Sequence, residues 1–289
     1  MFLVVYAFMP CHSFADNKTK TPRVPITVET DIYHYAMDVL KGREAIDVDD
    51  FSGPMVRRDI VDFILVQKAI ALGGFDIHFT FNHGNYDARN PKLLAKGLLL
   101  VSFDSIWLSR AEQMKEDVYI SQPIVRKGEY WAGVYTSPDN SSALAIKTLD
   151  DLRRHSVISS RAWKTDWATL LAINPRQLVN ESDWLSMTKM VSRSWVDVML
   201  IPFTKETPFQ YQGNGYKVVA IPGVKVMLDD SRHYLVSRKH PLGAQTFAAL
   251  QRGLAILRKQ GAIVKAYQQC GFLNEEVSDW VILNGLKGK

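Results

Sequence analysis

The chain has 289 residues, of which 47% are apolar and 22% are charged. This composition excludes a mainly disordered chain, and the length suffices for one large domain or two smaller domains with separate cores. The formal net charge is +5, but the Lys and Arg residues are scattered and form no run longer than Arg57-Arg58 or Arg153-Arg154. The sequence therefore contains no basic stripe that would follow a nucleic-acid backbone, and its charge indicates only a modest bias toward anionic ligands or partners.

The chain opens with an apolar stretch, residues 1–15, that ends in Ser13-Phe14-Ala15. Such an ending is typical of a signal peptide, so we expect cleavage before Asp16 and export to the periplasm, although the usual initial Lys or Arg is missing. The run is too short to span a membrane, and a buried N-terminal strand is the alternative. Cleavage removes Cys11 and leaves Cys270, so no intramolecular disulfide is expected.

Strand and helix patterns alternate in the next part of the chain. Val24–Val28 is a predicted strand, and apolar residues between 60 and 71 recur at helical spacing until Gly73-Gly74 ends the helix. Residues 75–81 alternate between apolar and polar, as in a strand with one buried face, and a further helix leads to a predicted strand at Leu98–Phe103. This order predicts a mostly parallel sheet flanked by helices.

A second set of strands and helices follows. Residues 127–135 are extended and aromatic, and we expect the chain to cross into a second lobe there. Thr148 and Asp151 have capping-box spacing, which predicts a short helix. Strands are then predicted at Val157-Ile158, Trp195–Phe203 and Tyr216–Ile221, and a helix is predicted from Lys164. We expect the chain to cross back near residues 229–234. The last predicted helix has an apolar stripe at Phe247, Leu250, Leu254 and Leu257.

Two stretches resemble one protein family. Phe103–Ile124 contains an apolar strand end, a short charged helix and a Ser-x-Pro step. Tyr216–Asn284 contains a strand, an Ile-Pro-Gly step, a second strand at His233–Ser237, a His-Pro step and then two helices. Their order is similar to that of family 3 bacterial extracellular solute-binding proteins, over roughly residues 23 to 284. The resemblance implies an α/β type II periplasmic-binding-protein fold, with two lobes of mostly parallel sheet flanked by helices and a cleft between them. We expect a signal peptide at 1–15, a first lobe at 22–128, a second lobe at 129–234 and a return to the first lobe at 235–289.

The resemblance also implies which positions face a ligand. The loop after the first strand supplies an aromatic wall, an Arg before the Ser-x-Pro step grips a carboxylate, and a helix start in the second lobe offers backbone N–H groups to an anion. Arg110 lies eleven residues before Ser121, about one helical turn further than the family pattern, so a surface salt bridge is its alternative role, as a solvated loop charge is for Arg161. The predicted ligand-binding residues are Tyr33, Tyr35, Asp104, Ser105, Trp107, Arg110, Ser160, Arg161 and Trp163.

One position departs from the family pattern. Members that bind α-amino acids usually carry an acidic residue five positions after the Asp of a strand like Val196-Asp197-Val198, and Pro202 occupies that position here. Because the acidic residue pairs with the ammonium group of the ligand, its absence argues against a standard amino acid. We therefore expect a small polar or anionic metabolite as the ligand.

Common catalytic and metal-binding motifs are absent from the sequence, and the spacing of His78 and His83 fits one face of neither a helix nor a strand. No cofactor, metal or catalytic residue is predicted. We expect the protein to deliver its solute to an ABC transporter permease or to a membrane sensor. Two alternatives stay open: an enzyme on the same scaffold, similar to periplasmic cyclohexadienyl dehydratases, and a degenerate module that binds no ligand. A cleft residue with a strongly shifted pKa would favour the enzyme.

Overall fold

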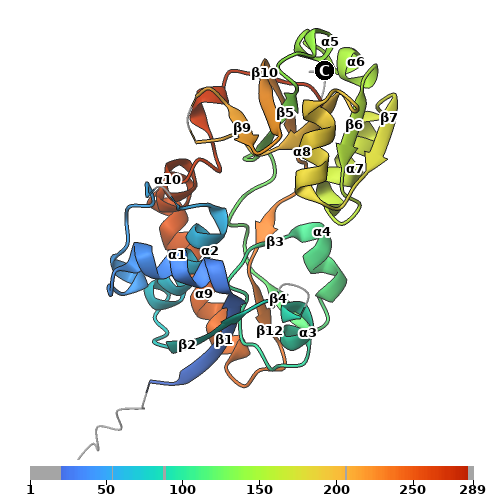
Figure 1. Ribbon diagram of the computed structural model, residues 1–289. Coiled ribbons are helices and arrows are strands. Elements are labelled where there is room, and N and C mark those ends of the chain that lie inside the picture. The colour runs from blue at the N-terminus through green and yellow to red at the C-terminus, as the bar shows by residue number, and fades with distance from the viewer. Residues whose placement is uncertain (1–20, 54, 87–88, 206, 286–289) are drawn as a thin grey trace, which may run out of the picture.

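The computed structural model describes residues 21–53, 55–86, 89–205 and 207–285. These residues form two lobes joined by extended segments (Figure 1), and the prediction of two α/β lobes is confirmed. The predicted signal peptide, residues 1–15, and its cleavage site before Asp16 lie outside the described residues. No helix in the described part of the chain is long and apolar enough to cross a membrane.

The first lobe contains short strand pairs. The pairs are β1 (Arg23–Glu29) with β2 (His78–Gly84) in parallel, and β3 (Ile106–Trp107) with β11 (Arg232–His233) and β4 (Val118–Ile120) with β12 (Leu235–Ser237), both antiparallel. The helices of this lobe are α1 (Thr30–Leu40), α2 (Arg58–Leu72), α3 (Asn90–Ala95), α4 (Leu108–Ala111), α9 (Gly243–Lys259) and α10 (Ala262–Gln269), with 3₁₀ turns at Ala45–Asp47 and Glu112–Met114.

Two predictions for this lobe are wrong. In the described stretch 98–103, an isolated bridge between Val101 and Val236 replaces the predicted strand. The ladder stays irregular because Ser102 exchanges two hydrogen bonds with Leu235, donating from its backbone N–H to the carbonyl and accepting at Oγ from the N–H. The pairing is also not mostly parallel, because the strands that return from the second lobe, β11 and β12, run antiparallel to their partners.

Within the described residues, the second lobe is built on a mixed sheet of seven strands in the order β13-β10-β5-β8-β6-β7, with β9 beside β10. The strands are β5 (Trp131–Thr136), β6 (Ser156–Ser159), β7 (Gln177–Asn180), β8 (Val198–Ile201), β9 (Gln210–Gly213), β10 (Tyr216–Met227) and β13 (Val281–Ile282). The helices are α5 (Ser141–Leu144), α6 (Leu149–Arg153), α7 (Lys164–Ile173) and α8 (Trp184–Ser192). The predicted capping box of Thr148 and Asp151 starts α6.

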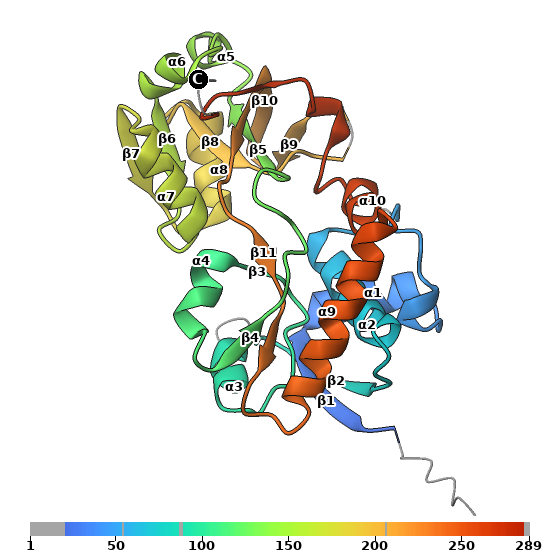
Figure 2. The same cartoon turned by 180° about the vertical axis from the view of Figure 1, so that it is seen from behind.

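The C-terminal segment crosses back to the second lobe (Figure 2). After α10 the chain passes through a 3₁₀ turn at Glu275–Val277 to β13, which pairs with β10. Lys225 of β10 is fully buried, and its ammonium group donates to the carbonyl oxygens of Val277 and Ser278. A buried ammonium group needs such acceptors, so this contact fastens the segment to the second lobe. The expected return of residues 235–289 to the first lobe therefore does not extend to β13.

Helices α2 and α9 approach each other very closely in the core of the first lobe. A Cβ atom on Gly253 of α9 would lie 1.7 Å from the carbonyl oxygen of Ala69, and one on Gly73 would lie 1.9 Å from that of Ala249. No side chain fits either contact without a shift of the helices. This packing fixes the position of α2, whose N-terminal end faces the second lobe.

Candidate functional site

A cavity of about 400 Å³ lies between the two lobes. The first lobe contributes the start of α2 and the segment after α10, and the second lobe contributes the loop after β8 and part of β9. Lining residues include Arg58, Asp59, Pro202, Lys205, Tyr211 and Phe272. A larger cavity of about 990 Å³ is lined by the first lobe alone. Because a ligand that closes two lobes must touch both, we assign the candidate site to the interlobe cavity.

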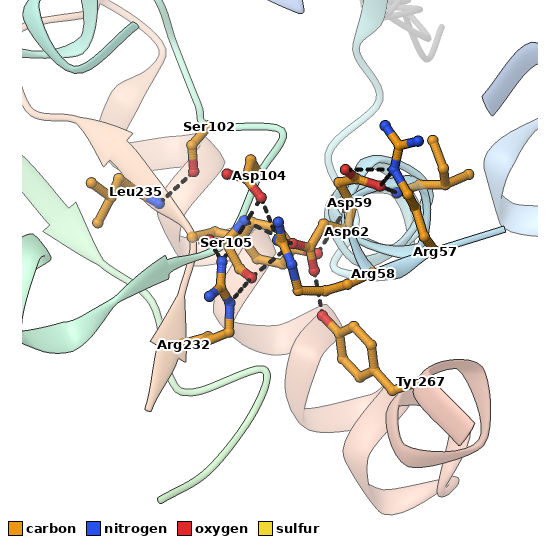
Figure 3. Close-up of polar contacts among 12 residues, drawn as sticks. Arg57, Arg58, Asp59, Asp62, Ser102, Asp104, Ser105, Arg232, Leu235 and Tyr267 are labelled. Carbon is orange, nitrogen blue, oxygen red and sulfur yellow. Dashed lines mark hydrogen bonds and ion pairs between the residues drawn. The ribbon is translucent and has the colours of Figure 1, made fainter. Parts of the chain in front are cut away.

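A buried carboxylate, Asp62, organises a charged network behind Arg58 (Figure 3), which we call the floor of the site. Arg58 is the member of this network that belongs to the described lining of the cavity. Asp62 lies one helical turn after Arg58 on α2, and its Oδ2 accepts from Nη1 of Arg58 at 2.5 Å. The same oxygen accepts from the backbone N–H and the hydroxyl of Ser105 at 3.0 and 2.7 Å, and Oδ1 accepts from the hydroxyl of Tyr267. Burial raises the pKa of Asp62, while the guanidinium group of Arg58 lowers it in part.

Two further charges complete this network. Nη1 of Arg58 also donates to Oδ1 of Asp104, and Arg232 lies 4.0 Å from the same oxygen. Arg232 donates from Nε to the hydroxyl of Ser105 at 2.9 Å, and its guanidinium carbon lies 4.7 Å from the ring centre of Trp107. Although burial raises the pKa of Asp104, Arg58 and Arg232 lower it more, so the pKa falls below its usual range. Two guanidinium groups thus balance two carboxyl groups.

Aromatic rings surround this polar floor. Tyr130 stacks on Phe272, with ring centres 4.5 Å apart and an interplanar angle of 13°, and lies 6.0 Å from Trp107. Tyr130 is 5% exposed, and its hydroxyl has no hydrogen-bond partner among the residues that the structure describes. Tyr211 donates its hydroxyl to the carbonyl oxygen of Pro202 at 3.0 Å, and burial raises its pKa to about 12. The walls of the site are therefore apolar ring surfaces.

The lobes also meet at the start of α7. Asp230, in the return crossing, accepts from the hydroxyls of Ser109 in the first lobe at 2.7 Å and Thr165 in the second lobe at 3.3 Å. Asp166, which follows Thr165, is half-buried, and among the described residues its carboxylate accepts from its own backbone N–H alone. Burial raises the pKa of Asp166 to about 6, and the attraction of Arg232 lowers it only in part.

Known structures share this architecture. No protein-family model matches the chain, and no curated protein sequence matches it significantly. The probable amino-acid ABC transporter extracellular-binding protein ytmK from Bacillus subtilis superposes with a TM-score of 0.59, at 10% identity, over 89% of this chain and 100% of that chain. The chain has the two-lobed periplasmic-binding-protein fold.

Two other solved structures agree. Substrate-binding domain 2 of GlnP from Lactococcus lactis, in an open conformation, gives a TM-score of 0.54 at 14% identity over 89% of this chain and 98% of that chain. The unliganded, open L-cystine solute receptor of Neisseria gonorrhoeae gives a TM-score of 0.51 at 14% identity over 91% of this chain and 97% of that chain. At these identities the likeness confirms the predicted fold, and the ligand of this chain is a separate question.

The predicted first-lobe residues fall into two groups in this fold. Asp104, Ser105 and Trp107 come together in the charged network, as described above. Tyr33 instead stacks on His83 at 4.9 Å, and Tyr35 lies under the guanidinium group of Arg57 at 5.5 Å. Neither tyrosine is among the described lining residues of the interlobe cavity. Arg110 lines a separate cavity of about 290 Å³ together with Asp104. A ligand-binding role for these residues stays a prediction.

The predicted second-lobe residues lie at the start of α7. The hydroxyl of buried Ser160 accepts from the N–H of Ala162 at 3.2 Å. Arg161 is exposed, and its guanidinium group packs 5.4 Å from the ring centre of Trp167. Trp163 is half-buried against the core of the second lobe. None of the three is among the lining residues of the interlobe cavity that the structure describes, so their role in binding also stays a prediction.

Sequence reasoning missed the residues that dominate the cavity floor. The sequence predictions include Arg58 only as part of a basic pair and do not include Asp62, Arg232 or Tyr267. One signal lies in the spacing: Arg58 and Asp62 are four positions apart at the start of α2, which begins two residues before the predicted apolar pattern, so their side chains lie on one face and can pair. A buried acid in an otherwise apolar helix face is a second signal, because burial of a charge requires partners.

Proposed function

We propose that this protein binds a small polar or anionic solute between its two lobes and presents it to a membrane protein. The observation that carries the proposal is the interlobe cavity, in which both lobes and the cationic Arg58 meet. Closing of the lobes around the solute would stabilise the closed state by the binding free energy. The names of the similar structures support this role, since they describe a substrate-binding domain, a probable ABC transporter extracellular-binding protein and a solute receptor.

This function requires a membrane partner, which is an ABC transporter permease or a membrane sensor. It also requires that the protein is exported to the periplasm. Both belong to the proposal. The location has a direct test: intact-mass measurement of the protein expressed with residues 1–15 in a bacterium should find Asp16 as the N-terminal residue. An uncut chain in the cytoplasm would contradict the proposed location.

A thermal-shift screen against a metabolite library tests the function. A solute present at about one hundred times its dissociation constant should raise the free energy of unfolding by about 2.7 kcal/mol. Hits should then be confirmed by calorimetry with a one-to-one stoichiometry. A library of amino acids, organic acids, amines and sugars that yields no hit would overturn the proposal and leave the alternative of a module that binds no small solute.

An enzyme is the second candidate, and Asp166 is the observation that favours it. Its pKa of about 6 lies in the range of a general acid at neutral pH, and its carboxyl group has no partner from another residue among those described. Incubation of the identified solute with the protein, followed by NMR, separates the two candidates. An unchanged solute after many hours supports a binding protein, whereas conversion that is lost in Asp166→Asn supports an enzyme.

A further inference from the structure

Among the described side chains that line the interlobe cavity, Arg58 keeps unpaired donors. Nη1 of Arg58 is occupied by Asp62 and Asp104, but no residue that the structure describes accepts from its Nε or Nη2. The Arg58 side chain is 24% exposed and lines the cavity. The Nε and Nη2 edge of a guanidinium group matches the two oxygens of a carboxylate, so this edge can donate two hydrogen bonds to a bound carboxylate.

The described lining of the cavity offers no unpaired carboxylate to a cation, and Asp166, the carboxylate at the start of α7, is not among these lining residues. Asp59 is the one carboxylate among the described lining residues, and both of its oxygens accept from Nε of Arg57 at 2.9 Å. One of them also accepts from the backbone N–H of Ile60. On the opposite side of the cavity, Pro202 has no polar side chain. An ammonium group placed here would lose its hydration without gaining a carboxylate partner.

The apolar part of the lining is aromatic. It is formed by Phe203, Tyr211 and Phe272, and the Phe272 ring is held in place by its stacking on Tyr130. The hydroxyl of Tyr211 is already bonded to the carbonyl of Pro202, so its ring contributes mainly apolar surface. A cavity of about 400 Å³ with aromatic walls accommodates a compound of one or two rings.

We infer that the interlobe cavity selects a small carboxylate with a flat apolar body and rejects the corresponding amino acid. The free edge of Arg58 binds the carboxylate, and the rings of Phe203, Tyr211 and Phe272 cover the apolar body. This inference rests on the proposed solute-binding function and specifies its ligand class. It also assigns a specificity-determining position to Pro202, because an acidic side chain there would supply the missing acceptor.

Three matched compounds test the selection. 3-Phenylpropanoate carries the carboxylate alone, 2-phenylethylamine carries the ammonium group alone, and L-phenylalanine carries both on the same skeleton. Calorimetry on the full exported chain should find binding of 3-phenylpropanoate, binding of L-phenylalanine at least tenfold weaker, and no binding of 2-phenylethylamine. Indole-3-acetate and phenylacetate extend the series to other ring sizes and chain lengths.

Substitutions at Pro202 keep the test independent of the buried network, because Pro202 is exposed. Pro202→Asp should weaken 3-phenylpropanoate binding at least tenfold and reduce the ratio of the affinity for 3-phenylpropanoate to the affinity for L-phenylalanine. The uncharged control Pro202→Asn should bind 3-phenylpropanoate with an affinity within about threefold of wild type. Arg58→Lys should also weaken binding of the carboxylate, since an ammonium group cannot form the bidentate contact. A melting curve for each variant shows whether it folds.

The outcomes separate this inference from the function on which it rests. Binding of L-phenylalanine as tight as that of 3-phenylpropanoate, or equal effects of Pro202→Asp and Pro202→Asn, would overturn the inference and leave the proposed function standing. Binding of some other library compound but of none of the ring carboxylates would do the same. If no compound of any class binds, the proposed function fails, and this inference fails with it.

Discussion

Replacement of Asp166 by Asn should stabilise the unliganded protein at neutral pH. The pKa of Asp166 is raised from 3.8 to about 6 in the folded state because the half-buried carboxyl group loses hydration and has no partner from another residue among those described. The folded protein therefore binds this proton more tightly than the unfolded chain does. The free energy of unfolding contributed by this group falls as the pH rises from about 4 to 6, and the full penalty is present above pH 6.

The size of the effect follows from the shift. A difference of about two pKa units corresponds to at most about 3 kcal/mol, and partial exposure of Asp166 to water reduces the expected penalty to about 1 to 2 kcal/mol. Asn has nearly the same shape but no charge. Asp166→Asn should therefore match wild type below pH 4 and be more stable by about 1 to 2 kcal/mol at pH 7.5.

Urea unfolding followed by tryptophan fluorescence, repeated from pH 4 to pH 8, measures this difference. Comparison of the two proteins at each pH removes the titration of all other groups. Asp38→Asn, at an exposed position of the first lobe, is the matched control for the loss of a carboxylate group. A stability difference for Asp166→Asn that stays constant across this range, or a variant less stable than wild type at pH 7.5, would refute the burial of this carboxyl group.

Three further predictions concern the core and the floor of the cavity. Gly253→Ala should lower the free energy of unfolding by about 1 to 3 kcal/mol or more, because the new methyl group meets the carbonyl of Ala69. A loss below about 0.5 kcal/mol, measured by chemical denaturation, would contradict the close helix contact. Tyr267→Phe should cost about 1.5 to 3 kcal/mol through the lost hydrogen bond to Asp62, again measured by denaturation. Burial raises the pKa of the Cys270 thiol to about 11, so at pH 8 iodoacetamide should label it about a hundredfold more slowly than an ordinary cysteine, as followed by peptide mass spectrometry. Labelling at the rate of a free thiol would show that this position is open to water.

The local patterns of the sequence were sufficient for the main helices. The apolar spacing between residues 60 and 71 predicted α2, and the stripe from Phe247 to Leu257 predicted α9. The strand predicted at Leu98–Phe103 failed because residues 99–101 and Phe103 are buried by packing, while the ladder is broken by the side chain of Ser102. Periodicity reports burial, and it does not report which backbone groups are paired.

The candidate site was harder to predict for a physical reason. Asp104, Ser105 and Trp107 were found because they follow one another in a stretch that resembles a known family. The contacts that give them their environment join residues far apart in the chain: Arg232 and Ser105 are separated by 127 positions, and Tyr267 and Asp62 by 205. Local spacing carries no information on such pairs, because they exist only after the return segment has packed against the first lobe.

The charged network also explains how a solute could draw the two lobes together. Arg58, Arg232, Asp62 and Asp104 balance one another, so a carboxylate at the free edge of Arg58 brings a negative charge that the floor does not compensate. Lys205 is the cation on the second-lobe side of the cavity, and its ammonium group already reaches across to the carbonyl of Ser52 at 2.7 Å. In the proposed function, attraction between a bound carboxylate and Lys205 would act across the gap between the lobes. It would therefore favour a closed state over an open one and contribute to binding only when the lobes approach.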